Sequence, residues 1–162
     1  MDWRQLPTAC SIEGDPNYQD CRLPRDEAIG LGLIQEPASD EAISLSDLPE
    51  FQYLPLLDPR RSIRVLCLEG PRRVQGHHQE TVPSASFHHF PLVAKLPFIA
   101  LSYAWGNPEK KCPILLNDCL FWVTESLASA LERFQEQDRM LPLWADAICI
   151  NQEDLKEKGP HD

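Results

Sequence analysis

The feature that most constrains the fold is an apolar run that ends in a cluster of polar side chains, from Leu143 to Gln152. Almost no polar residue interrupts it before Asp146, and such continuous apolarity is typical of a strand covered on both faces. The pattern therefore predicts a buried strand over residues 143–148. This strand would deliver four side chains to one edge of a sheet, namely Asp146, Cys149, Asn151 and Gln152.

A second segment upstream, residues 98–106, has the same design. Its apolar start predicts a strand over residues 98–103, and the turn chemistry of the following Gly-Asn-Pro ends it. If the two strands are parallel neighbours, their carboxyl ends meet at one sheet edge, where open α/β sheets collect ligands. We therefore expect a shared functional edge that also includes Ser102, Tyr103, Trp105 and Gly106.

The intervening sequence predicts the remaining elements. Branched residues over 62–68 favour a strand, and residues 71–96 are interpreted as a long connection that holds a short strand or a variable insertion. Two apolar runs, 112–116 and 119–123, flank Asn117-Asp118 and predict a β-hairpin. Thr124 then caps a helix whose apolar spacing extends to about Gln137. This order predicts an α/β fold, a small, open and mostly parallel sheet flanked by helices with one hairpin.

Charge is distributed unevenly along the 162 residues, whose formal net charge is −10. Residues 1–58 hold 12 Asp and Glu against 3 Lys and Arg, while residues 59–162 hold 13 against 12. We expect an acidic, proline-containing and partly ordered N-terminal extension over 1–58, then one domain over 59–162. The nearly neutral domain has no basic stripe for nucleic acid, and no apolar run is long enough to span a membrane. Without a secretory signal, we expect a cytoplasmic protein with mostly free thiols.

Chemical candidates are few. Asp146 has two interpretations, a structural anchor for the Trp105-Gly106 turn or a functional acid, and burial would raise its pKa. The apolar setting of Cys149 favours an inert thiol over a nucleophile. Cysteine spacing favours no metal site, and the pairs His77-His78 and His88-His89 are poor ligand sets. No phosphate-binding loop is present, so no cofactor is expected.

Three blocks in this order resemble the fungal heterokaryon-incompatibility (HET) domain. They are residues 100–106, residues 123–131 and residues 143–157, and the strand near Ile63 resembles the one that precedes them. The resemblance covers about residues 60–158. It implies a cytoplasmic module of non-self recognition that triggers programmed cell death. Its partners would be other proteins, copies of itself among them.

The resemblance also implies a sheet that is TIR-like or flavodoxin-like in outline. An alternative function follows, hydrolysis of NAD or another nucleotide with Asp146 or Glu157 as the catalytic carboxylate. The missing phosphate loop favours the non-enzymatic module, and NAD enters only under the alternative. Ala145 and the Gly159-Pro160 ending depart from the family pattern. We expect a domain that is truncated after the block of residues 143–157. A further alternative for its function is therefore an inactive fragment.

Overall fold

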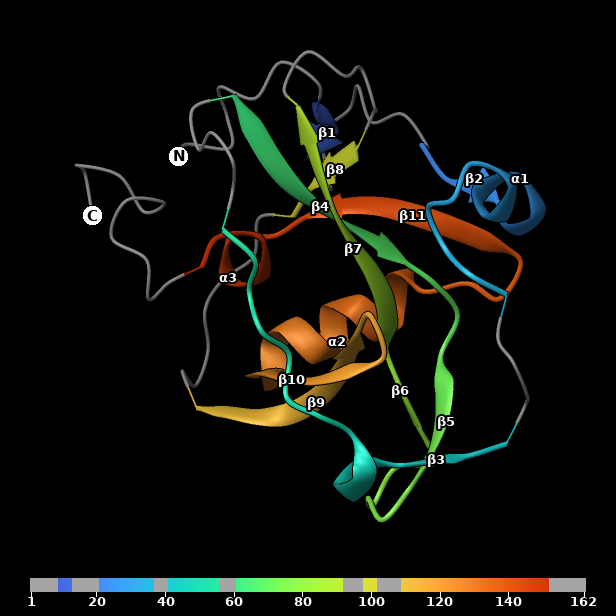
Figure 1. Cartoon of the computed structure of the whole chain (residues 1–162), viewed down its shortest axis with the longest axis vertical. Coiled ribbons are helices and arrows are strands. Elements are labelled where there is room, and N and C mark those ends of the chain that lie inside the picture. The colour runs from blue at the N-terminus through green and yellow to red at the C-terminus, as the bar shows by residue number, and fades with distance from the viewer. Residues whose placement is uncertain are drawn as a thin grey trace.

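The computed structural model describes residues 9–12, 21–36, 41–55, 61–91, 98–101 and 109–151. Within them, eight strands form one sheet in the order β1-β8-β11-β4-β7-β9-β10, with β2 pairing beside β11, and β3, β5 and β6 form a second sheet (Figure 1). The strands are β1 (Ala9–Ile12), β2 (Leu23–Pro24), β3 (Ile43–Ser44), β4 (Ser62–Leu68), β5 (Arg72–Gln75), β6 (Thr81–Val82), β7 (Ser84–Pro91), β8 (Phe98–Ala100), β9 (Lys110–Leu116), β10 (Cys119–Thr124) and β11 (Arg139–Trp144). The helices are α1 (Arg25–Gly30), the 3-10 helix η2 (Leu45–Asp47), α2 (Glu125–Phe134) and α3 (Asp146–Cys149).

The predicted α/β class, a mostly parallel sheet flanked by helices in a TIR-like or flavodoxin-like outline, is wrong. The large sheet is mixed: β8 runs parallel to β1 and β11, but β11 is antiparallel to β4, and β4 is antiparallel to β7 along its whole length. A largely parallel sheet needs long crossovers, which are usually helical. The described helices are too few and too short for that design, and strands dominate the fold.

The segment interpreted as a long connection is the main source of this error. Residues 72–91 form β5, β6 and β7, and β7 lies inside the large sheet between β4 and β9. Its sequence holds two histidines and two serines, so it lacks a strong apolar signal. Ala85 and Phe87 are nevertheless buried, and pairing with β4 over seven positions fixes the strand.

Strand β4 is central because both of its faces are covered. Cys67 packs with Met140, Ala28 and residues of the turn after α1, whereas Leu66 and Leu68 belong to the main core with α2. In Figure 1, α2 and α1 lie on different sides of β11. Removal of this apolar surface from water is the main source of stability.

Helix α2 confirms the prediction from periodicity. The backbone N–H of Leu127 donates to the Thr124 hydroxyl at 3.3 Å, which is the expected N-cap bond. Four apolar side chains at helical spacing are buried, Leu127, Ala130, Leu131 and Phe134. The helix ends at Phe134, three residues before the predicted end.

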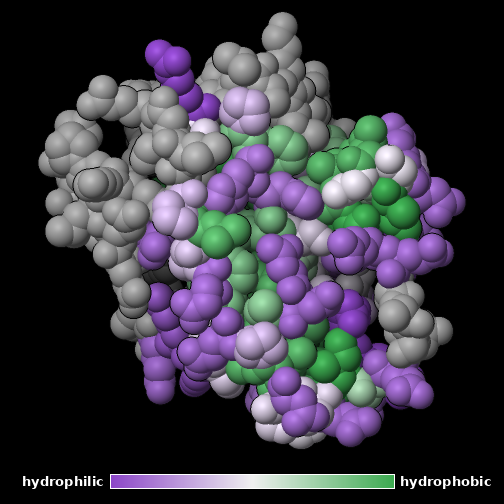
Figure 2. Space-filling view, viewed as in Figure 1, coloured by the Kyte–Doolittle hydropathy of each residue, from purple (hydrophilic) through white to green (hydrophobic). Residues whose placement is uncertain are grey.

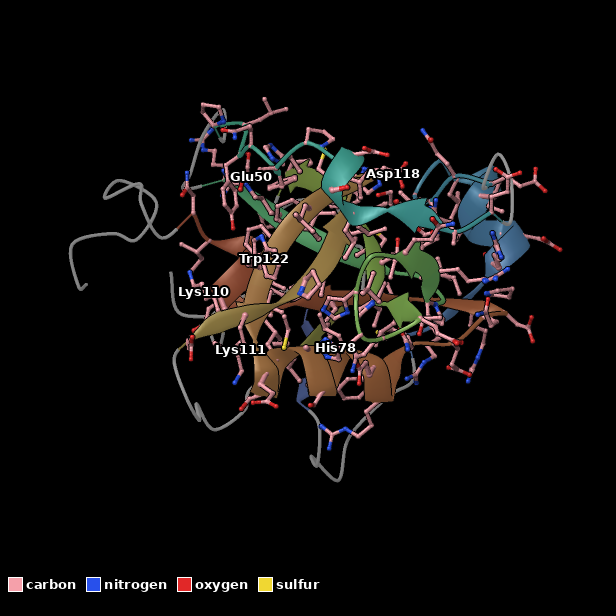
Figure 3. All side chains as sticks on the ribbon, turned by 90° about the horizontal axis from the view of Figure 1, so that it is seen from below. Glu50, His78, Lys110, Lys111, Asp118 and Trp122 are labelled. Atoms are coloured by element: carbon pink, nitrogen blue, oxygen red, sulfur yellow. The ribbon has the colours of Figure 1, made fainter. Side chains whose placement is uncertain are left out.

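The predicted β-hairpin is also confirmed, with β9 and β10 paired antiparallel around Asn117 and Asp118. Both turn residues have positive φ, 51° and 61°, as a two-residue turn of this kind requires. Asn117 also fastens the hairpin to β7, because its Oδ1 accepts from the Phe87 N–H at 2.8 Å. Figure 3 shows Asp118 at one end of the hairpin and Lys110 and Lys111 at the other.

We predict that Asn117→Ala lowers the free energy of unfolding by about 2 kcal/mol, because it strains the left-handed backbone and leaves the Phe87 N–H without its acceptor. Asn117→Gly also removes the side-chain acceptor, but glycine adopts a positive φ without strain. Its loss of stability should therefore be about half as large. Urea unfolding followed by circular dichroism measures both. Equal losses for the two variants would show that the side-chain hydrogen bond carries the effect alone, and a negligible loss for Ala would contradict both contributions.

The N-terminal third contributes strands to the same sheets. β1 pairs with β8, and β2 pairs with β11. Residues 49–51 run beside β10, where the Phe51 N–H donates to the Leu120 carbonyl at 2.9 Å. Phe51 and Tyr53 then make edge-to-face contacts with Phe87 and Phe121. The domain boundary near residue 58 stays a prediction.

Candidate functional site

The candidate site lies where β8 and β11 end together. The strands are parallel, with Ile99 opposite Leu143 and Ala100 opposite Trp144. Beyond the last pair, the Leu101 N–H donates to the Trp144 carbonyl at 2.8 Å. The prediction that these two segments are parallel neighbours is therefore confirmed, and the chain leaves both strands at the same edge.

The predicted strand over residues 143–148 is wrong in its second half. Strand β11 ends at Trp144, and Asp146–Cys149 form the one-turn helix α3. Asp146 is therefore a residue of α3 and not of the strand. A strand and a turn of helix would both require apolar side chains here, because Ile148 and Cys149 are buried. Periodicity over such a short run cannot separate a buried strand from a buried turn of helix.

Asp146 is half-buried at the first position of α3. Burial raises the pKa of its carboxyl above the ordinary value, and backbone hydrogen bonds from Ala147 and Asp146 itself lower the pKa by a smaller amount. Removal from water therefore outweighs the hydrogen bonds here. A carboxyl in this position holds its proton at a higher pH than a solvated aspartate.

Cys149 is buried, and its sulfur accepts a hydrogen bond from the Ala145 N–H at 3.4 Å. Burial raises the pKa of this thiol to about 12, against which the Ala145 N–H and the Arg64 charge act only weakly. At neutral pH the thiol is protonated, and thiolate is the nucleophilic form. The geometry thus supports an inert thiol at this position. The five cysteines in the described ranges, Cys21, Cys67, Cys112, Cys119 and Cys149, are all free.

Two residues missed by the sequence interpretation, Arg64 and Tyr53, hold α3 in place. Arg64 is only 1% exposed, although it sits in strand β4. Its Nη1 donates to the Cys149 carbonyl at 3.4 Å, and the Tyr53 hydroxyl donates to the Ile148 carbonyl at 2.7 Å. The last carbonyls of a one-turn helix have no hydrogen-bond partner within the helix. Arg64 and Tyr53 provide the missing donors for two of them.

The Arg64 side chain also contacts the segment of residues 53–54 and strand β7. Its Nη2 donates to the Leu54 carbonyl at 2.8 Å, and its Nε donates to His89 Nε2 at 3.3 Å. The guanidinium also lies 5.0 Å from the centroid of the Tyr53 ring, within the range of a cation–π contact. An arginine inside the otherwise apolar strand of residues 62–68 was the signal in the sequence, because a charge there must find buried partners.

Most of the predicted edge residues lie outside the described residues. These are Ser102, Tyr103, Trp105 and Gly106 after β8, and Gln152 and Glu157 after α3. Asp146, Cys149 and Asn151 are described and lie together in and just after α3. The interpretation of Asp146 as an anchor for the Trp105-Gly106 turn therefore stays a prediction.

The histidine pairs do not converge on a common point. His88 Nε2 lies 2.7 Å from the Leu33 carbonyl, while His89 accepts from Arg64, because alternate residues of β7 face opposite sides. The ring centroids of His77 and His78 lie 4.1 Å apart, with the two rings tilted by 34° to each other. Across the described ranges, no three His, Cys, Asp or Glu side chains are placed to hold a metal ion. In the same ranges, no helix is long and apolar enough to cross a membrane.

Comparison with known proteins matches the segment that builds this edge. Residues 98–161 fit the family described as heterokaryon incompatibility protein (HET). This segment is similar to the HET family. The resemblance expected from the three sequence blocks is therefore confirmed. The HET segment begins with β8 and includes the hairpin, α2, β11 and α3.

A curated relative of the HET family extends the similarity toward the N-terminus. The chain is 29% identical over 135 residues to heterokaryon incompatibility protein 6, OR allele, of Neurospora crassa. The alignment covers 75% of this chain and 19% of that protein, so the chain spans about a fifth of the length of this relative. No solved structure matches the chain significantly.

Proposed function

We propose that this chain acts in fungal heterokaryon incompatibility, as a cytoplasmic module that signals non-self recognition and programmed cell death. The HET match and the name of the Neurospora crassa relative support the incompatibility role. We place the output at the edge where β8 and β11 end, because β8, β11 and α3 all belong to the segment that matches the family. The observation that carries this choice is the anchoring of α3 by Arg64 and Tyr53.

We further propose that the module works by protein assembly. The Cys149 carbonyl and thiol of α3 both have hydrogen-bond partners inside the protein. Helix α3 therefore has the features of a fixed structural element rather than a reactive centre. Cys149 is protonated at neutral pH, which does not support nucleophilic catalysis. The nucleotide-hydrolase alternative relied on a TIR-like parallel sheet, and the mixed sheet removes that argument.

The test is inducible expression of the chain in a filamentous fungus, with growth and hyphal viability as the readouts. We expect the unmodified chain to arrest growth. Asp146→Ala and Trp105→Ala should each abolish this output while the purified proteins keep their circular dichroism spectra. Asp138→Ala is the matched control, because Asp138 is exposed and precedes β11 at its other end.

Three results would count against the proposal. The unmodified chain could leave growth unchanged, or the Asp146 and Trp105 variants could arrest growth as fully as the control. The third concerns the hydrolase alternative. If purified protein consumes NAD and Glu157→Gln stops both this consumption and the growth arrest without changing the oligomeric size, the protein works as an enzyme.

A further inference from the structure

A region with two cavities lies at the opposite end of β11 from α3. A cavity of about 380 Å³ opens between α1, the turn after β4 and the start of β11, within the size range of small-molecule sites. A neighbouring cavity of about 360 Å³ shares Ile34, Glu69 and Arg72 with it. We call the first cavity the arginine cleft. Figure 1 shows β2 and α1 beside one end of β11 and α3 beside the other.

Basic side chains are concentrated at the arginine cleft. Its lining includes four arginines and two glutamates, namely Arg25, Arg72, Arg73, Arg139, Glu41 and Glu69. The chain as a whole carries a formal charge of −10, whereas the lining of the cleft holds more positive than negative side chains. In Figure 2, hydrophilic residues form a band between the apolar residues around α1 and the lower part of the molecule. The cleft therefore concentrates guanidinium groups on an otherwise acidic protein.

Two of these guanidinium groups are held in place from outside the cleft. Arg139 makes a forked contact with Glu136, with Nη2 at 2.8 and 2.9 Å from the two carboxylate oxygens. Arg72 pairs with Asp118 at 3.1 Å, at the tip of the hairpin. Neither Glu136 nor Asp118 lines the arginine cleft. Groups fixed in this way lose less conformational entropy when a ligand arrives.

The backbone around the cleft is also tightly packed. A Cβ atom at Gly70 would lie 2.7 Å from Gln137 Oε1 and 3.0 Å from the Gln137 Cα. The turn after β4 and the segment before β11 therefore approach each other closely at this glycine. This contact fixes the distance between the two sides of the cleft that carry Arg72 and Arg139.

Glu69 is the half-buried carboxyl of the cleft, and Ser86 donates to it at 3.3 Å. Burial raises its pKa, while the charges of Arg72 and Arg25 lower it by smaller amounts. The positive charges of Arg72 and Arg25 therefore lie close enough to stabilise the ionised Glu69 carboxylate. Among the described residues, Arg25 and Arg73 have no ion pair with a carboxylate within 4 Å.

We propose that the arginine cleft binds a small phosphate-bearing anion, a ligand beyond the incompatibility role and independent of the α3 edge. Guanidinium groups donate in a planar fork that matches phosphate oxygens, and several of them fit a group with three acceptor oxygens and up to two charges. Arg25 and Arg73 make the main ion pairs with the ligand. Arg72 contributes its remaining donors, Arg139 adds positive charge to the lining, and Glu69 limits the affinity by its negative charge.

The test is titration of the purified chain with inorganic phosphate and with pyrophosphate, by calorimetry and by amide chemical shifts. We expect saturable binding, tighter for pyrophosphate, with shifts centred on the amides of Gly70, Arg72 and Arg139. Arg25→Gln and Arg73→Gln should each weaken binding about tenfold, the effect of losing one charged hydrogen bond. Arg133→Gln, a matched change on α2 outside the cleft, should alter it less than about twofold. Glu69→Gln should tighten it.

Several outcomes would overturn the proposal. They are the absence of saturable binding of both anions, shifts centred away from the cleft, and equal weakening by Arg133→Gln. If Arg25→Gln fails to fold, the exposed Arg73 decides the question, and unchanged affinity in Arg73→Gln rejects the site. None of these outcomes affects the growth assay, so the two proposals fail separately.

Discussion

Arg64→Met is expected to lower the free energy of unfolding by about 3 kcal/mol, a large share of the stability of a domain of this size. Methionine fills part of the volume but donates no hydrogen bond. The carbonyls of Cys149 and Leu54 then lose a charged donor in the interior, where an unpaired polar group is costly. Urea unfolding followed by circular dichroism gives the difference from the unmodified chain.

The matched control is Arg73→Met, because Arg73 is exposed on β5 and should change stability by less than about 0.5 kcal/mol. Tyr53→Phe provides an intermediate case. It removes only the hydroxyl that donates to Ile148, for an expected loss of about 1 kcal/mol. An Arg64 variant as stable as the control would show that α3 does not depend on these donors.

Trp144→Ala should have the largest effect of all, about 4 kcal/mol. Among the described residues, Trp144 is the largest fully buried side chain and is 1% exposed, at the position where β11 ends against β8. Truncation leaves a cavity beside the start of α3, and neighbouring side chains can close it only in part. We expect the midpoint of thermal unfolding, measured by circular dichroism, to fall sharply.

The chain offers the same substitution at an exposed site as a control. Trp122 on β10 is 40% exposed, and Figure 3 shows it on the hairpin strand. Trp122→Ala should cost about 1 kcal/mol, since less apolar area leaves the interior. Similar losses for the two tryptophan variants would contradict the burial assigned to Trp144.

Most of the elements predicted correctly are those whose information is local in the sequence. Asn117 and Asp118 tolerate positive φ, and that preference alone sets the hairpin. Thr124 and the spacing of Leu127 and Leu131 likewise define the start and the buried face of α2. The parallel neighbours β8 and β11 were also predicted, because two apolar runs followed by polar residues suit the same buried environment.

The errors involve contacts between segments that are distant in the sequence. The strand character of β7 depends on pairing with β4, because its own histidines and serines give a weak pattern. The helical turn of α3 depends on Arg64 and Tyr53, which lie about 85 and 95 residues earlier in the chain. Of the candidate site, the sequence predicted the place and the residues near Asp146, but not these two supports.

Taken alone, the sequence determined the hairpin, helix α2, the strand character of β8 and β11 and the similarity of the segment that contains them to the HET family. Turn preference, helix capping and apolar periodicity act over a few residues, so they can be recognised without a structure. The tertiary structure decided the mixed sheet, the burial of Arg64 and the position of the arginine cleft. These features depend on which distant strands pair and which polar groups then lose water, and no short stretch of sequence contains that information.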